Sequence, residues 1–325
     1  MPRTRARGGG RGGTREARRG RRPPAQDRRG AGAAARRGVS ERRPLSERLI
    51  RRAARPPFGG DRTGKGWLAS FARAQPHVVV RQRIEAPGWP KFSRPLRIAF
   101  LTDLHAGSHT ADAERLAAIA AEAAAMAPDL VLLGGDYVNM QPFGGGRLPP
   151  DIVARAMARI EAPLGAFAVL GNHDYTYGER EVAASFEAAG IAVLDHVRAT
   201  VTFDGAALDI VGVPDAHVVR DRAHALLAGL SPQRPAIVLA HDPVWFGHVP
   251  AGPFVTLAGH THGGQIRLPG LGVIMNSSKA PLRWSQGLIV ENGRTMFVSA
   301  GLGTSSVPLR IGVPPEYALL DIGGG

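Results

Sequence analysis

The sequence contains no cysteine, and this absence excludes two kinds of structure at once. No disulfide can form, and no thiolate can bind a metal ion. Any metal site must therefore use histidine, aspartate, glutamate or asparagine side chains. The absence is compatible with the cytoplasm, where disulfides are rare.

Long apolar runs are also missing. No stretch of about 20 consecutive apolar residues occurs, so we expect no transmembrane helix. SERRPL at residues 40–45 is similar to an export signal, but the best apolar stretch after it, GWLASF at residues 66–71, is too short to complete one. We expect a cytoplasmic protein, and any contact with the inner face of the membrane would be peripheral.

The first 60 residues have few large apolar side chains and carry the whole of the charge imbalance. They hold 19 of the 41 Lys and Arg residues but only 4 of the 27 acidic residues, so this segment carries +15 and the rest of the chain −1. Such a segment cannot bury enough apolar surface to fold, and we predict that it is disordered. Either it is a basic arm for RNA or anionic lipid, or it is a solvated leader or an upstream extension from a misassigned start. Nucleic acid is a candidate partner for this tail under the first alternative, and it is not expected to bind the rest of the chain.

Residues 95–325 have the pattern of a folded α/β domain, and residues 61–94 are predicted to be a linker with a short helix and a lead-in strand. PLRIAFLTDLH and LVLLGGD predict buried strands that begin near residues 95 and 130. Helices are expected between and after them, at residues 111–126, 150–160 and 179–189. The β-α-β alternation predicts parallel strands covered by helices.

The second half of the chain consists mostly of short predicted strands separated by turn residues. The dipeptide Asn292-Gly293 predicts a hairpin between two of them. The strand-forming stretches are VRATVTF, ALDIVGV, AIVLAHD, FVTLAGH, LIVENGRTMFVSAG and YALLDI. We therefore predict an α/β fold in four layers, an α/β/β/α sandwich of two mixed sheets flanked by helices.

Polar side chains follow five of the predicted strands, at the point where each strand ends. They are Asp103 and His105, then Asp136, then Asn172, His173 and Asp174, then His241, and finally His260 and His262. Ligands bind outside the carboxyl ends of strands in open α/β sheets. The sequence therefore predicts one shared site built from these strand ends.

Each of these residues also has a simpler explanation when it is taken alone. Asp136 after two glycines is typical of a helix N-cap, and His241 is typical of a core histidine. In GHTH, His260 and His262 are two positions apart, so an extended backbone would aim both rings at the same place. The occurrence of all of them on successive strand ends favours a shared metal site.

The blocks DLH, GGDYVN, GNHD, AHD and GHTHGGQ, in this order, closely resemble those of the calcineurin-like metallophosphoesterases. Asn139 stands at the position that is Asp or Asn in that family, and the resemblance spans residues 96–322. The stretches GHTHGGQIRLPG, VSAGLGTSSVPLR and PPEY resemble a bacterial membrane-associated branch that includes UDP-2,3-diacylglucosamine pyrophosphatase-type enzymes of lipid A biosynthesis. Members of that branch often carry an N-terminal membrane or export segment. This chain instead has the arginine-rich segment at its N-terminus.

This resemblance implies a metallo-dependent phosphatase-like fold with two divalent metal ions. One ion would be held by Asp103, His105 and His262, and Asp136 would bridge both ions. The other ion would be held by Asn172, His241 and His260. Manganese is the expected metal, and iron, zinc or cobalt would also suit these nitrogen and oxygen ligands.

The resemblance also implies hydrolysis of phosphodiester, pyrophosphate or phosphomonoester bonds by a metal-bridging hydroxide. His173 would act on the leaving group as an acid or a charge stabiliser, and Asp174 would hold its ring in the required tautomer. The substrate would be a small phosphoester or a lipid-linked one such as UDP-2,3-diacylglucosamine.

A lipid-linked substrate requires an apolar patch beside the metals. The sequence offers six candidates, which core packing would also explain: Leu268, Leu271, Val273, Ile274, Trp284 and Leu309. The alternative function is that of a non-catalytic metal-binding module, recruited to RNA or an anionic membrane by its basic tail.

Overall fold

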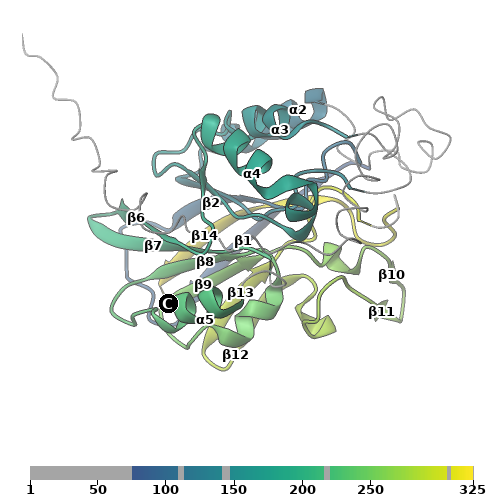
Figure 1. Ribbon diagram of the computed structural model, residues 1–325. Helices are drawn as coiled ribbons and strands as arrows, with labels where there is room; N and C mark the ends of the chain where they lie inside the picture. Colours follow the sequence, from purple (N-terminus) through teal and green to yellow (C-terminus); the bar gives the residue numbers. More distant parts are fainter. Residues whose placement is uncertain (1–74, 109–112, 141–146, 216–219, 306–308, 325) are drawn as a thin grey trace, which may run out of the picture. The chain divides into compact units, whose positions relative to one another are not determined.

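The computed structural model describes residues 75–108, 113–140, 147–215, 220–305 and 309–324 (Figure 1). The predicted basic tail and GWLASF lie outside the described residues. All described residues fall within one compact unit, Pro44–Gly325. In the ranges given above, no helix is both long and apolar enough to cross a membrane.

The first sheet has six strands and is mixed. β2 to β5 run parallel, while β14 is antiparallel to β2 and parallel to β1. The strand expected in the linker is therefore a full member of this sheet, through its pairing with β14. Across the sheet the strands are β1 (Val78–Ala86), β14 (Glu316–Gly324), β2 (Leu96–Leu101), β3 (Leu130–Leu133), β4 (Ala166–Ala168) and β5 (Ala192–Val193).

The second sheet also has six strands, and its four inner strands run parallel. Antiparallel hairpins close both edges. Asn292 and Gly293 adopt φ angles of 53° and 70°, as a tight hairpin turn requires, so the predicted hairpin is confirmed. The order is β12 (Gly287–Glu291), β13 (Arg294–Val298), β9 (Phe254–Ala258), β8 (Ala236–Ala240), β7 (Ala206–Val213) and β6 (Arg198–Phe203).

Strand alternation divides the apolar side chains between two cores. In β2, Ile98 and Phe100 face the second sheet, whereas Ala99 and Leu101 face the helices. The first sheet is covered by α2 (Ala113–Ala125), α3 (Pro150–Met157) and α4 (Asn172–Ala188). The outer face of the second sheet is covered by α5 (Arg220–Ala228) and the 3-10 helix η1 (Pro243–His248). The predicted four-layer α/β/β/α sandwich is confirmed (Figure 1).

Two helices differ from the sequence-based expectation. α4 begins at Asn172 rather than at residue 179, so the GNHD block forms its first turn and Gly178, with φ of 152°, interrupts it. Asp174 makes this early start possible because its carboxylate accepts the backbone N–H of Gly171. α5 was not expected, since RDRAHALLA has no clear apolar period.

Candidate metal centre

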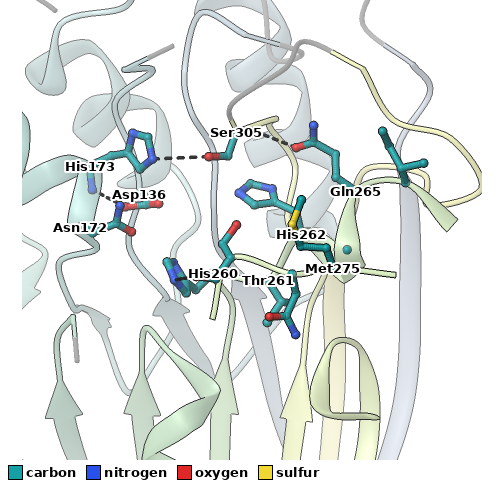
Figure 2. Close-up of a pocket in the computed structure, with 13 residues that line it drawn as sticks. Asp136, Asn172, His173, His260, Thr261, His262, Gln265, Met275 and Ser305 are labelled. Carbon is teal, nitrogen blue, oxygen red and sulfur yellow. Dashed lines mark hydrogen bonds between the residues drawn. The ribbon is translucent and has the colours of Figure 1, made fainter. Parts of the chain in front are cut away.

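The carboxyl ends of five strands from both sheets bring the predicted polar residues together. Six of the seven predicted metal ligands are buried, and Asn172 is half-buried. Four of the seven, Asp136, Asn172, His260 and His262, line a pocket of about 470 Å³ (Figure 2). The pocket is lined by Asp136, Asn172, His173, His260, Thr261, His262, Gly264, Gln265, Ile266, Met275, Asn276, Ser277 and Ser305.

The first group of donor atoms consists of Asp103, His105 and His262. Each offers one potential ligand atom, and these atoms lie within 4.8 Å of one another. The Nε2 atoms of His105 and His262 are 3.2 Å apart, and His262 Nε2 is 3.6 Å from Asp103 Oδ1. We call these three residues the first cluster.

The second group consists of Asp136, His241 and His260, whose ligand atoms also lie within 4.8 Å of one another. His241 Nε2 is 3.1 Å from His260 Nδ1 and 3.3 Å from the amide oxygen of Asn172. Asn172 is therefore placed to complete this group. We call Asn172, His241 and His260 the second cluster.

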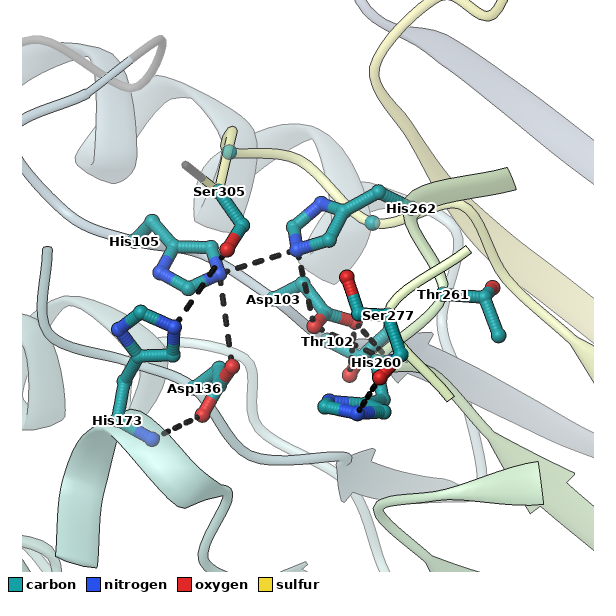
Figure 3. A network of polar contacts seen from close by, with 12 residues as sticks. Thr102, Asp103, His105, Asp136, His173, His260, Thr261, His262, Ser277 and Ser305 are labelled. Carbon is teal, nitrogen blue, oxygen red and sulfur yellow. Dashed lines mark hydrogen bonds and ion pairs between the residues drawn. The ribbon is translucent and has the colours of Figure 1, made fainter. Parts of the chain in front are cut away.

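Asp136 lies close to both clusters, and Figure 3 shows it beside His105 of the first cluster. Its Oδ2 atom is 3.5 Å from His105 Nε2 and 3.6 Å from His241 Nε2. Its Oδ1 atom accepts the backbone N–H of His173 at 2.9 Å. One carboxylate oxygen thus faces both groups, which is the placement that a bridging ligand requires.

Hydrogen bonds on the far side of two rings fix which nitrogen faces the cluster. His241 Nδ1 lies 2.8 Å from the carbonyl of Gly134, and His260 Nε2 lies 3.2 Å from the carbonyl of Ser277. A carbonyl only accepts, so each of these nitrogens donates a proton when the ring is neutral. His241 Nε2 and His260 Nδ1 then direct their lone pairs toward each other. Hydrogen bonds to the outer nitrogen typically orient metal-bound histidines in this way.

The backbone of the site is strained at five of the seven predicted ligands. Their φ angles are positive, a region that non-glycine residues rarely enter. The values are 50° for Asp103, 37° for His105, 56° for Asp136, 66° for His260 and 51° for His262. The expectation of an extended backbone through GHTH was therefore wrong, and its two rings join different clusters.

Burial and mutual charge set the protonation of the site. Burial alone would lower the pKa of His241, but the carboxylates of Asp136 and Asp103 outweigh it and raise the pKa to about 9. Burial would raise the pKa of Asp136, yet the histidines around it, first His241, hold that pKa well below its usual range. Burial, followed by the charge of His173, lowers the pKa of His105 to about 3. Without metal at neutral pH, Asp136 is ionised and His105 is unprotonated, which are the forms that bind metal ions, whereas His241 carries a second proton that a bound cation would displace.

The donor set fits divalent cations. It combines neutral imidazoles with carboxylate and amide oxygens, the ligands that suit manganese, iron, zinc or cobalt. The Nε2 atom of His105 lies 3.2 Å from that of His262 and 3.5 Å from Asp136 Oδ2, and all three side chains are buried. Buried polar groups that face one another without donors between them are costly, and cations would satisfy them.

Asp174 has a different role from the one expected. Its carboxylate accepts three backbone N–H groups, from Gly171 at 2.9 Å, Asp136 at 2.8 Å and Tyr137 at 2.9 Å. Among the described residues no hydrogen bond joins it to the ring of His173. Asp174 therefore ties the end of β3 to the start of α4 and positions Asp136, instead of holding the His173 ring.

His173 faces the pocket, and the structure adds neighbours that sequence reasoning missed. Its Nε2 atom is 3.5 Å from Ser305 Oγ, and Ser305 donates its backbone N–H to Gln265 Oε1 at 2.8 Å. Gln265 belongs to the GHTHGGQ block, and this membership is the sequence feature that could have indicated its place in the site. Arg310, a buried arginine 3.3 Å from His262 Nδ1, was also missed.

Comparison with known proteins gives matches across the same region. The sequence model of the calcineurin-like phosphoesterase family matches residues 96–264. Phosphodiesterase YaeI of Escherichia coli (strain K12) is 29% identical and covers 73% of this chain and 89% of its own length. UDP-2,3-diacylglucosamine pyrophosphatase LpxG of Chlamydia trachomatis serovar D is 25% identical and covers 69% of this chain and 83% of its own length.

Among solved structures, the 5'-nucleotidase precursor from Thermus thermophilus matches with a TM-score of 0.40 and 16% identity. The match covers 64% of this chain and 49% of that one, so this chain spans about half of the nucleotidase's length.

The family match covers more than half of the chain and includes all five strand ends at which the two clusters are built. The resemblance first indicated by the DLH, GGDYVN, GNHD, AHD and GHTHGGQ blocks is thereby confirmed. This protein belongs to the calcineurin-like phosphoesterase family.

Proposed function

We propose that the protein is a dinuclear metal-dependent hydrolase of phosphodiester or pyrophosphate bonds. The observation that carries the proposal is the position of Asp136, whose Oδ2 atom lies 3.5–3.6 Å from one histidine of each cluster. Two groups of donors that share one carboxylate are typical of a two-metal site. A single structural ion would need only one of the clusters.

In this proposal Asp103, His105 and His262 hold one cation, and Asn172, His241 and His260 hold the other. The two ions would supply Lewis-acid stabilisation of the phosphoryl group and acidify a water molecule. Manganese is our proposed metal, because the mixture of imidazoles and oxygen ligands suits it better than magnesium.

His173 is proposed to act on the leaving oxygen. Its ring lines the pocket, and its backbone N–H donates to Asp136, so the residue is held beside the metal-binding carboxylate. Burial lowers the pKa of His173, so the ring is neutral near pH 7. A neutral ring still carries one N–H, which can donate a hydrogen bond to an oxygen that gains negative charge.

The surface beside the pocket favours a substrate with an apolar part. Within the described part of the chain, six large apolar side chains are exposed around β10 (Arg267–Leu268) and β11 (Gly272–Val273). We call them the apolar surface: Leu268, Leu271, Ile274, Met275, Leu309 and Ile311. Met275 also lines the pocket, and Ile311 pairs with the pocket residue Ile266. Of the sequence-based candidates, Trp284 is instead part of the core.

This arrangement supports a lipid-linked phosphoester as substrate. The polar part would enter the pocket while an acyl chain lay on the apolar surface, since contiguous exposed apolar patches are typical of binding sites. The similarity to LpxG makes UDP-2,3-diacylglucosamine the first lipid to assay. Such a substrate would bring the protein into peripheral contact with a membrane.

A phosphodiester series of increasing acyl length tests this function. The full-length protein with Mn²⁺ should hydrolyse a short-chain diester, and a long-chain one with higher kcat/KM. Leu271→Ser with Ile274→Ser should lower the long-chain to short-chain ratio by about 10-fold or more, because each buried aliphatic side chain contributes about 1.5–3 kcal/mol. Leu288→Ser with Val290→Ser, which changes exposed residues of β12, should leave the ratio unchanged.

Two results would contradict the proposal. An unchanged ratio in the Leu271→Ser, Ile274→Ser variant would exclude the lipid-linked substrate. Absence of hydrolysis of every ester by metal-loaded protein would instead support the alternative of a non-catalytic module.

A further inference from the structure

Arg310 is a buried cation that the proposed chemistry does not use. Its side chain is 2% exposed, although arginine is almost never fully buried without strong partners. It lies beyond the family match, shortly before β14, and it does not line the pocket. Its position therefore requires a reason other than contact with substrate.

The guanidinium of Arg310 binds the backbone of the segment that follows β13. Arg310 Nε donates to the carbonyl of Gly303 at 2.8 Å. Its Nη2 atom donates to the carbonyls of Ala300 at 2.6 Å, Gly301 at 3.0 Å and Gly303 at 2.6 Å. One side chain thus holds three carbonyls of residues 300–303 in a fixed arrangement.

The opposite side of this segment lies directly on two members of the first cluster. Gly303 donates its N–H to the carbonyl of Asp103 at 2.7 Å. A Cβ atom at Gly301 would come within 2.5 Å of Asp103 Cβ, and one at Gly303 within 2.6 Å of His105 Cβ. Contacts this close allow only glycine, so any displacement of the segment must change the support of Asp103 and His105.

Arg310 also contacts the third member of the first cluster. Its Nη2 atom is 3.3 Å from His262 Nδ1, on the side of the ring away from His105. The second cluster is supported differently, because the outer nitrogens of His241 and His260 lie against the carbonyls of Gly134 and Ser277. Among the described residues, the contacts of Arg310 therefore support the first cluster and do not reach the second.

We infer that Arg310 is a positioning residue for one of the two cations. Its planar guanidinium holds Asp103 and His105 through the 300–303 segment and His262 by direct contact, and it leaves the second cluster to other supports. The inference rests on the proposed two-metal function and deepens it. The two ions would share Asp136, but only binding of the ion in the first cluster would depend on Arg310.

The geometry of Arg310, and not its charge, is the useful property. A guanidinium near a bound divalent cation repels it, so the charge alone would weaken metal binding. The benefit must come from several donors held in one plane, which lysine cannot offer. Arg310→Lys should therefore behave like Arg310→Met.

The test measures metal content and the Mn²⁺ electron paramagnetic resonance spectrum of full-length protein. Wild-type protein should hold two Mn²⁺ ions per chain and show magnetic coupling between them. Arg310→Met and Arg310→Lys should retain one ion, with the spectrum of an isolated Mn²⁺, and bind the second about 10–100-fold more weakly. Gly303→Ala, which keeps the arginine but pushes the segment off His105, should lose the same ion.

Arg294→Met is the matched control. Arg294 also donates to three carbonyls through one nitrogen, those of Phe246, Gly247 and Val249 at 3.0–3.4 Å, but it has no contact with either cluster among the described residues. This variant should keep two ions and the coupled spectrum. Its thermal unfolding shows what the loss of such a carbonyl network does to stability alone.

The outcomes separate this inference from the proposed function. If Arg310→Met keeps two tightly bound ions, or loses both, the inference is wrong while the two-metal proposal stands. If Arg310→Lys keeps two ions, the planar arrangement of donors is not required and the inference also fails. If wild-type protein never binds more than one ion, the proposed function itself is wrong.

Discussion

Replacing Asp136 by asparagine should remove at least one cation and lower kcat/KM for a phosphodiester by about 10³-fold or more. The carboxylate lies close to one histidine ring of each cluster, and asparagine keeps its shape but neither its charge nor its second anionic oxygen. Loss of one ion from a two-metal site removes several kcal/mol of transition-state stabilisation, which is a factor of 10³ or more at about 1.4 kcal/mol per tenfold.

The Asp136→Asn variant should still fold. Asparagine tolerates the φ angle of 56° at this position, and its side-chain oxygen can still accept the N–H of His173. Metal content and hydrolysis should be measured on the same preparation. Asp321→Asn is the control, since Asp321 is a partly exposed carboxylate paired with Arg97. An Asp136→Asn variant that keeps two ions and full activity would refute the bridging role.

Replacing His173 by alanine should leave both ions bound and lower kcat by about 10²–10⁴-fold, the usual contribution of an acid–base group. The ring lines the pocket beside Ser305 and belongs to neither cluster in our assignment. Alanine favours the helical first turn of α4 and retains the backbone N–H that binds Asp136.

Metal content and kcat measured on the same samples decide the role of His173. His224→Ala, which changes an exposed histidine on α5, should alter neither quantity. If His173→Ala lost metal but kept its rate per bound ion, His173 would be a ligand and our assignment would be wrong.

The strand ends could be predicted from sequence because the relevant information is local. Each of the five blocks combines an apolar run with a polar residue directly after it, and parallel strands bring such ends to one edge. The apolar run in PLRIAFLTDLH likewise predicted the buried strand β2. These features depend on periodicity and turn chemistry within a few residues.

Two kinds of feature could not be predicted because they depend on distant packing. Arg310 reaches His262 across 48 positions, and nothing in the local PLR sequence indicates burial. Asp174 follows His173 directly, which suggested a contact with its ring, yet three backbone amides bind its carboxylate instead. The left-handed backbone at His260 and His262 overrode the alternation expected of an extended strand.

Metal removal is the most direct test of the central claim that the two clusters seat a pair of cations that drive hydrolysis. Elemental analysis and phosphodiester hydrolysis should be followed together during exhaustive chelation and then during titration with Mn²⁺. We predict that hydrolysis disappears with the metal and returns in full only as the second ion per chain is bound. Hydrolysis at an undiminished rate by metal-free protein would contradict the account.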